Sequence, residues 1–111
     1  MSLVSILYLL CCKKGYLDIL TVLHEHGCPW AVGTTRKAAL YGHLDCLMYA
    51  HEHGCRWDER TTRYACENGS LACLEYAHEH GCPWAEGTIE EAQKGGYYDC
   101  LDYALDHGCT K

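Results

Sequence analysis

The sequence has few of the residues that mark a flexible linker, a membrane span or a nucleic-acid interface. It contains only two prolines, which leaves little room for a stiff linker or a disordered tail. No stretch reaches the roughly 18 apolar residues that a membrane-spanning helix needs. Lys and Arg number 9 against 15 Asp and Glu, so the formal charge is −6 and a nucleic-acid backbone is not the expected ligand. We therefore expect an ordered chain that binds neither nucleic acid nor membrane.

The apolar segment at residues 1–10 also lacks the marks of a signal peptide. No basic region opens it and no small-residue cleavage site follows it. The 111 residues suffice for one modest core, so we expect a single domain over residues 1–111. An intracellular protein, cytoplasmic or nuclear, is predicted.

The strongest signal that is present is an uninterrupted internal repeat of 27 residues. The pentapeptide His-Glu-His-Gly-Cys stands at residues 24–28, 51–55 and 78–82. A tryptophan and two glycines recur with the same spacing, and a fixed period of this kind is typical of solenoids. The units are approximately residues 1–30, 31–57, 58–84 and 85–111.

Each unit contains two helical patterns. In the second unit Leu44, Leu47 and His51 share one face of an amphipathic helix, and a glycine follows as its expected C-terminal cap. We predict long helices at residues 17–26, 44–53, 71–80 and 98–107, shorter helices at 34–41, 61–68 and 88–95, and an apolar opening helix at 3–10. The predicted fold class is all-α, an α-solenoid of about four stacked helix-turn-helix repeats without a β-sheet.

The last of the shorter helices carries a predicted N-terminal cap. Thr88 is followed three residues later by Glu91, which is the pattern of a capping box. In such a box the hydroxyl accepts a hydrogen bond from a backbone N–H of the first turn, and the carboxylate reaches back to the backbone. We therefore expect both side chains to cap this helix.

Two segments of the second unit carry a family resemblance. GHLDCL at residues 42–47 and EHGC at residues 52–55 resemble the second helix and turn of an ankyrin repeat, and the Thr-initiated helix with its Ala-Ala pair resembles the first. The resemblance covers nearly the whole chain, but the period is 27 residues rather than about 33. The missing residues fall between Trp57 and Thr61, where ankyrin repeats carry a β-hairpin finger, and the Thr-Pro-Leu-His segment of the family is absent. The chain thus resembles a shortened, finger-less ankyrin relative.

This resemblance implies a non-catalytic protein–protein interaction scaffold, whose partner binds along the groove formed by the shorter helices and loops. In that family the variable residues just before each turn glycine contact the partner. With loop residues added, the partner-binding candidates are Lys13, Lys14, Leu40, Tyr41, Asp58, Glu59, Arg60, Arg63, Glu67, Asn68 and Lys94. The partner is expected to be another protein, and the chain a monomer or part of a longer array. No triad, phosphate loop or paired-carboxylate motif appears, so neither catalysis nor a cofactor is predicted.

The His-Glu-His-Gly-Cys series carries the competing hypothesis of a metal- or thiol-dependent protein, because imidazole and thiolate are ligands that zinc prefers. Two histidines at positions i and i+2, such as His51 and His53, lie about 200° apart around a helix and cannot face one ion. We therefore predict structural roles: His51 faces the core, and His53 lies in the last turn, near the negative end of the helix dipole. No metal ligand is predicted.

The cysteines and tryptophans are also open to two interpretations. Equivalent cysteines of stacked helix pairs are expected about 10 Å apart, beyond the roughly 7 Å between Cα atoms that a disulfide spans, so free core thiols are expected. Trp30, Trp57 and Trp84 could form a ligand-binding ladder or a clamp between units, and we favour the clamp.

The charged residues sort by helix. Acidic residues collect on the outward face of the long helices, which predicts an acidic ridge there. The basic residues of the shorter helices and loops form a partly basic front: Arg36, Lys37, Arg56, Arg60, Arg63 and Lys94.

Overall fold

The computed structural model describes residues 3–31 and 33–109. These residues form eight α-helices and no β-strand. The helices are α1 (Leu3–Lys14), α2 (Leu17–Glu25), α3 (Thr34–Leu40), α4 (Leu44–Glu52), α5 (Arg60–Glu67), α6 (Leu71–Glu79), α7 (Thr88–Gly95) and α8 (Tyr98–Asp106). The predicted all-α class is therefore confirmed. The repeated helices lie within one residue of their predicted bounds, whereas α1 continues past residue 10 to Lys14.

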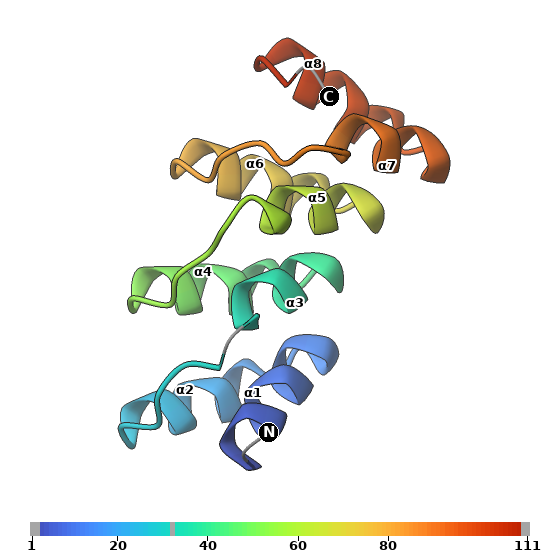
Figure 1. Cartoon of the computed structure of the whole chain (residues 1–111). Coiled ribbons are helices and arrows are strands. Elements are labelled where there is room, and N and C mark those ends of the chain that lie inside the picture. The colour runs from blue at the N-terminus through green and yellow to red at the C-terminus, as the bar shows by residue number, and fades with distance from the viewer. Residues whose placement is uncertain (1–2, 32, 110–111) are drawn as a thin grey trace.

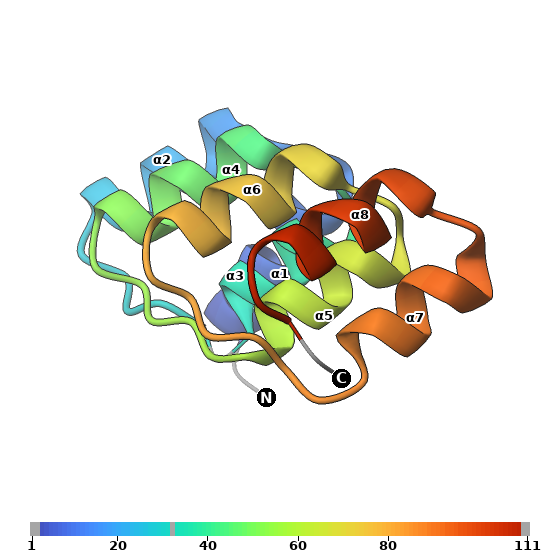
Figure 2. The same cartoon turned by 90° about the horizontal axis from the view of Figure 1, so that it is seen from above.

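The helices stack as pairs along one axis, which gives an elongated molecule of 40 × 23 × 22 Å (Figure 1). Helices α1, α3, α5 and α7 contact one another in succession and form a first-helix layer. Helices α2, α4, α6 and α8 form a second-helix layer in the same way (Figure 2). None of the described helices is long and apolar enough to cross a membrane.

A continuous core lies between the two layers. Leu20, Leu47 and Leu74 occupy the same position in three successive second helices, and all three are fully buried. The first helices contribute small residues to this core, including Ala38, Ala39, Ala65, Cys66 and Ala92, which are also fully buried. Small side chains let the two layers approach closely, so the repeated pattern of the sequence is the pattern of the core.

The Gly-Cys end of the repeated pentapeptide closes each second helix. In α4 the Gly54 N–H bonds to the His51 carbonyl at 3.2 Å, and the Cys55 N–H bonds to the Ala50 carbonyl at 2.9 Å. These two bonds form a Schellman motif, in which the last carbonyls of a helix are satisfied by the turn that follows. The motif requires a left-handed residue, and Gly54 provides it with φ of +91°.

The second histidine of the pentapeptide satisfies another carbonyl of the same helix end. His53 Nδ1 lies 2.8 Å from the Tyr49 carbonyl oxygen. Because a carbonyl only accepts, Nδ1 carries the proton. The equivalent histidines His26, His80 and His107 make the same bond at 2.8 Å. His53 was predicted in the last turn, but α4 ends at Glu52 and His53 is the C-cap residue that follows it. Its contact with the helix end is a hydrogen bond.

The first histidine of the pentapeptide packs against tryptophan at the junction between units. His24 stacks on Trp30, with ring centroids 4.7 Å apart, and Tyr49 of the next unit stacks on His53 at 4.0 Å. The Trp30 indole N–H donates to the His53 carbonyl at 3.1 Å. The third junction repeats these contacts with His78, Trp84, Tyr103 and His107. These tryptophans join successive units, which confirms the clamp interpretation.

The capping box predicted at Thr88 is wrong. Gly87 is the N-cap residue of α7, with φ of +92° and no side-chain cap, and Thr88 is the first helical residue. Because Thr88 is fully buried, its hydroxyl needs a nearby acceptor, and it donates to the Ala85 carbonyl at 2.8 Å. The Glu91 carboxylate lies 4.0 Å from Lys94 Nζ instead of reaching back to the helix start.

Candidate functional site

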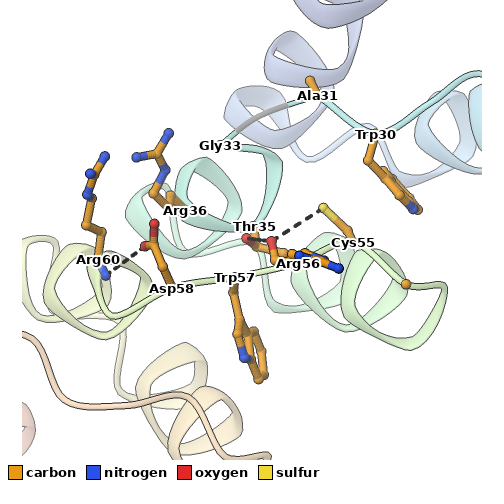
Figure 3. Close-up of a pocket in the computed structure, with 11 residues that line it drawn as sticks. Trp30, Ala31, Gly33, Thr35, Arg36, Cys55, Arg56, Trp57, Asp58 and Arg60 are labelled. Atoms are coloured by element: carbon orange, nitrogen blue, oxygen red, sulfur yellow. Dashed lines mark hydrogen bonds between the residues drawn. The ribbon is translucent and has the colours of Figure 1, made fainter.

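A pocket of about 490 Å³ opens between the loop that leads into α3 and the loop that leads into α5 (Figure 3). This volume lies within the range of about 300–1,000 Å³ that is usual for ligand sites. Its lining consists of Trp30, Ala31, Gly33, Thr35, Arg36, Gly54, Cys55, Arg56, Trp57, Asp58 and Arg60. The chain's remaining arginine, Arg63, lies on α5 outside this lining.

The backbone of the second loop is tied to α3 and to itself. The Thr35 hydroxyl donates to the Arg56 carbonyl at 3.0 Å, and the Cys55 thiol lies 3.8 Å from the same oxygen. The Asp58 carboxylate accepts the Arg60 N–H at 2.9 Å. These bonds fix the loop backbone, so the arginine side chains project from a defined frame (Figure 3).

The positive charge of the pocket is not offset by ion pairs. In residues 3–31 and 33–109 none of the three lining arginines forms a salt bridge. Arg36 is half-buried and lies over Gly33, where an added Cβ would be 2.8 Å from the guanidinium Nη2. Arg56 and Arg60 are exposed. Asp58 supplies the acidic group of the lining, so positive charge is in excess there although the chain as a whole carries −6.

The loop that joins the second and third units departs from its counterparts, the loop that joins the first and second units and the loop that joins the third and fourth. Residues 29–34 read PWAVGT and residues 83–88 read PWAEGT, whereas residues 56–61 read RWDERT. Charged side chains thus stand at Arg56, Asp58 and Arg60, where the other loops have proline, alanine and glycine. Two of the three arginines of the pocket come from these exchanges.

The exchange of glycine for arginine changes how the helix begins. Gly33 and Gly87 precede α3 and α7 with φ of +89° and +92°, in the left-handed region that glycine adopts without strain. In the loop that joins the second and third units Glu59 is the N-cap residue, with φ of −59°, and α5 begins at Arg60. The charged loop therefore enters its helix by a different backbone path.

This path leaves a buried hydroxyl without a partner. The Thr34 and Thr88 hydroxyls donate to the carbonyls of Ala31 and Ala85, each at 2.8 Å. The equivalent Thr61 is fully buried, and its Oγ1 has no hydrogen-bond partner among the described residues. An unsatisfied buried polar group costs roughly 1–3 kcal/mol. The charged loop that joins the second and third units thus comes at the expense of stability.

Apart from Arg63, the partner-binding candidates from the sequence divide into two groups. Asp58, Glu59 and Arg60 lie at the start of α5, and the first and last of these line the pocket. The other group lies where the first helices end and the chain turns, and it consists of Lys13, Lys14, Leu40, Tyr41, Glu67, Asn68 and Lys94. The structure therefore places one group where a first helix begins and the other where the first helices end, and not at a single site.

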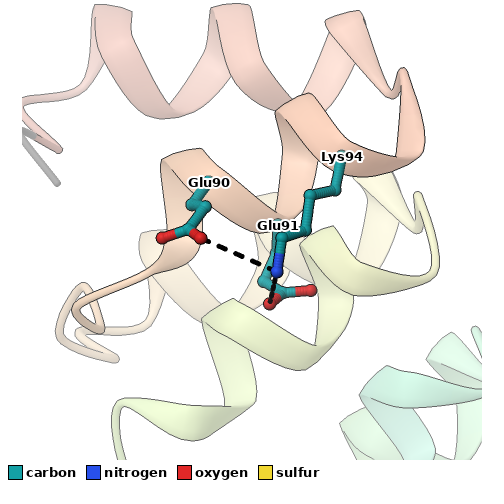
Figure 4. Close-up of polar contacts among 3 residues, drawn as sticks. All are labelled: Glu90, Glu91 and Lys94. Atoms are coloured by element: carbon teal, nitrogen blue, oxygen red, sulfur yellow. Dashed lines mark ion pairs between the residues drawn. The ribbon is translucent and has the colours of Figure 1, made fainter.

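Several members of the turn group interact with each other or with their own helix. Lys13 Nζ lies 5.9 Å from the centroid of the Tyr41 ring, and that tyrosine is 38% exposed. Lys94 Nζ lies 3.6 Å from Glu90 and 4.0 Å from Glu91, so its charge is engaged on α7 (Figure 4). Tyr41 is thus the more available anchor of this group.

Arg63 differs from a simple surface residue. Its guanidinium carbon lies 5.5 Å from the centroid of the Tyr64 ring, and its side chain is half-buried. Its Nε is buried, and no hydrogen-bond partner for it lies in the described part of the chain. An effect of replacing Arg63 would therefore include a change in packing.

The histidines and cysteines of the pentapeptide contact the scaffold. The His51 ring stacks on Trp57 at 3.9 Å, whereas the His53 ring bonds to the Tyr49 carbonyl, so the two rings have different partners. Among the described residues no group of three or more His, Cys, Asp or Glu side chains could hold a metal ion. Burial raises the pKa of Cys55 to about 11, so this thiol is protonated at neutral pH and is a poor nucleophile.

The nine cysteines from Cys11 to Cys100 are free thiols, but one contact between them was missed by sequence reasoning. Cys100 of α8 lies close to Cys66 of α5, and the influence of its thiol together with burial raises the pKa of Cys66. Only equivalent cysteines of successive units are related by the repeat period. A contact between a first helix and the second helix of the next unit therefore has no signature in that spacing.

The pocket arginines were noted in the sequence as part of a basic front, but Arg36 and Arg56 were not among the predicted site residues. The three loop sequences, aligned by the repeat, contain the signal that could have found Arg56 and grouped it with Arg60. In comparisons with known proteins the chain matches no family model and no curated protein.

Proposed function

We propose that the chain is a non-catalytic protein-interaction scaffold of shortened, ankyrin-like repeats, and that a partner protein binds along the first helices and their loops. Support for the ankyrin-like repeat comes from the helix pairs, the glycine turns, and the short loops that stand where a finger would be. Because no known family matches the chain, its relation to ankyrin repeats rests on these features and on the sequence resemblance.

The observation that carries the proposal is the uneven distribution of change among the units. Core and cap positions keep the same residue types, as in Leu20, Leu47 and Leu74. The loop that joins the second and third units carries charged residues, and the hydroxyl of Thr61 at its end is unsatisfied within the described residues. Deviations from the locally favoured sequence are expected at functional sites, where another benefit offsets them. A recognition surface on a uniform scaffold accounts for this distribution.

The residue types exposed on the first-helix layer also support this layer as the face that binds the partner. Tyrosine and arginine are the types that, with tryptophan, most often anchor protein interfaces. Tyr41 is exposed where a first helix ends, and Arg56 and Arg60 are exposed in the loop that leads into a first helix. A partner that spans the layer would contact both groups.

Site-specific photo-crosslinking in the source cell tests the proposal. A photoreactive amino acid is placed at position 41 or 67 in the first-helix layer, and at position 25 or 102 in the second-helix layer. We expect positions 41 and 67 to crosslink to the same protein and positions 25 and 102 to crosslink to none. With that protein purified, Tyr41→Ala should weaken binding by roughly tenfold or more in calorimetry, and Asp102→Ala should leave it unchanged. Crosslinks from the second-helix layer alone would assign the working face to the opposite side.

A further inference from the structure

The charge and shape of the pocket indicate what kind of partner segment it takes. We infer that the pocket binds an acidic segment of a partner protein, whose side-chain carboxylates pair with Arg36, Arg56 and Arg60; this inference rests on the proposed function. Arginine is suited to this role because its planar guanidinium forms two parallel hydrogen bonds with one carboxylate. The three side chains have no ion-pair partner among the described residues, so their charge is available to a ligand.

The arrangement of the arginines fits an extended segment. In Figure 3 the side chains of Arg36 and Arg60 extend to the same side, whereas Arg56 extends along the loop toward Cys55. The guanidinium groups therefore do not converge on one point, as a site for a single phosphate would require. Successive carboxylates along a peptide can reach separate arginines, and a pocket of about 490 Å³ has room for more than one side chain.

The charge of the rest of the molecule argues against nucleic acid as the occupant. A nucleic-acid backbone needs a continuous basic surface, because its affinity comes from neutralising many phosphates. Here the net charge is −6, and the second helices carry exposed acidic residues such as Asp18, Glu52 and Asp102. The excess of positive charge is confined to the pocket, which suits a short acidic segment.

The chain provides a matched control for this site. The variant R56P/D58A/R60G gives residues 56–61 the sequence PWAEGT of residues 83–88, which already folds in the same scaffold. In that loop the Thr62 hydroxyl bonds to the Pro83 carbonyl at 3.1 Å, as Thr35 bonds to the Arg56 carbonyl at 3.0 Å, so the tie to the preceding helix is compatible with proline. The variant removes two of the three arginines and should fold with an unchanged or higher melting temperature.

The binding experiment uses the full chain and a short fluorescein-labelled peptide of alternating glutamate and glycine. We expect the wild-type chain to bind this peptide with an affinity that falls as salt is added. The same peptide with glutamine in place of glutamate should not bind. R56P/D58A/R60G should weaken binding by roughly tenfold or more, because charge-assisted hydrogen bonds are lost. A second variant, R36Q/R60Q, keeps the loop length and proline content and should weaken binding to a similar extent.

Other results would overturn the inference. Equal binding of the glutamate and glutamine peptides, or equal binding by the wild type and both variants, would remove the role of the arginines. Displacement of the peptide by inorganic phosphate or by an oligonucleotide more readily than by unlabelled peptide would assign the pocket to phosphate. Salt-sensitive dimerisation in sedimentation, lost in R56P/D58A/R60G, would make the acidic helices of a second copy the occupant.

The two proposals fail in different ways. A crosslinked partner that is released by Tyr41→Ala but retained by R56P/D58A/R60G would overturn the acidic segment and leave the scaffold function standing. Crosslinks confined to the second-helix layer would overturn the scaffold face itself, whatever the peptide does.

Discussion

The loop at residues 56–61 and its counterpart at residues 83–88 have the same supports and different surfaces. Each follows a buried cysteine, and a threonine of the preceding first helix bonds to the carbonyl of its first residue, Thr35 to Arg56 and Thr62 to Pro83. The loops then diverge in charge, in the entry to the helix and in the bonding of the buried threonine. Because the supporting bonds use backbone carbonyls, the loop side chains can change without loss of the connection between units.

The divergence also reaches the tryptophan junctions. Trp30 and Trp84 donate their indole N–H groups to the carbonyls of His53 and His107 at 3.1 Å. In the part of the chain that the structure describes, Trp57 makes no equivalent bond, and its ring lies closer to the preceding histidine, at 3.9 Å from His51. The second unit thus differs from its neighbours both in its loop and in the ring packing behind it.

The largest expected effect tests whether the difference between the second unit and its neighbours is absent from the hydrophobic core. Leu47→Ala in the second unit and Leu74→Ala in the third each remove a fully buried side chain, so each should lower the free energy of unfolding by roughly 2–5 kcal/mol. Urea denaturation of the two variants should give similar values. A loss at Leu47 much smaller than that at Leu74 would extend the difference between the units into the core.

A smaller effect is expected from replacing the buried threonines, because the loops differ in how these hydroxyls are hydrogen-bonded. Thr34→Val and Thr88→Val each remove a bonded hydroxyl and leave a carbonyl with one donor fewer, so each should cost roughly 0.5–1.5 kcal/mol. Thr61→Val replaces an unsatisfied hydroxyl with a methyl group of similar volume, so it should be neutral or stabilising. Thermal melts of the three variants provide the measurement. An equal loss at all three positions would contradict the assignment of Thr61 as unsatisfied.

The pH dependence of stability should further distinguish the junction at Trp57 from the junctions at Trp30 and Trp84. Burial lowers the pKa of His51 and the nearby His80 lowers it too, while Glu52 acts in the opposite direction. His51 also lies 3.1 Å from the Tyr76 hydroxyl. Because the folded state favours the neutral ring, the unfolded state binds more protons in the window between the lowered pKa and the ordinary value of about 6.5. Stability from this group is therefore complete above about pH 6.5 and decreases as the pH falls into that window.

His51→Gln should flatten this part of the profile. Melting temperatures of the wild-type chain and the variant, measured from neutral pH down to about pH 5, provide the test. A wild-type melting temperature that rises on acidification in the window assigned to His51, and ceases to rise in the variant, would reverse the sign and contradict the prediction.

The smallest expected effect concerns α7, the helix into which the loop at residues 83–88 leads. Lys94→Ala removes two exposed ion pairs with Glu90 and Glu91, and should change the free energy of unfolding by at most about 0.5 kcal/mol. The melt should shift little more in low salt than in high salt. A loss above about 1 kcal/mol would mean that Lys94 packs against the scaffold in a way that its exposure does not indicate.

Much of the scaffold could be predicted from the sequence because its determinants are local. Gly54 marks a left-handed turn, Leu47 marks a core face, and Trp30 marks a junction, and each recurs at a fixed interval. The role of Thr88 was predicted wrongly, because a threonine at a helix start can accept a hydrogen bond as a cap or donate one from the first helical position. Burial decides between the two, and the sequence pattern does not contain it.

The candidate site was less predictable for a related reason. Asp58 and Arg60 were identified as partner-binding candidates, but Arg36 belongs to a different unit and reaches the pocket only through the stacking of α3 and α5. The contact between Cys66 and Cys100 likewise joins two units at unequal positions. Such relations depend on how one helix pair sits on the next, which the repeat period alone does not specify.

The succession of contacts along each layer has a consequence for how the chain reaches this structure. Each helix pair contacts mainly the pair before it and the pair after it, so most contacts join residues that are close in sequence. Chains with predominantly local contacts fold fast, because little loop-closure entropy is lost before the contacts form. In such an array a nucleus can arise at any junction and grow in both directions.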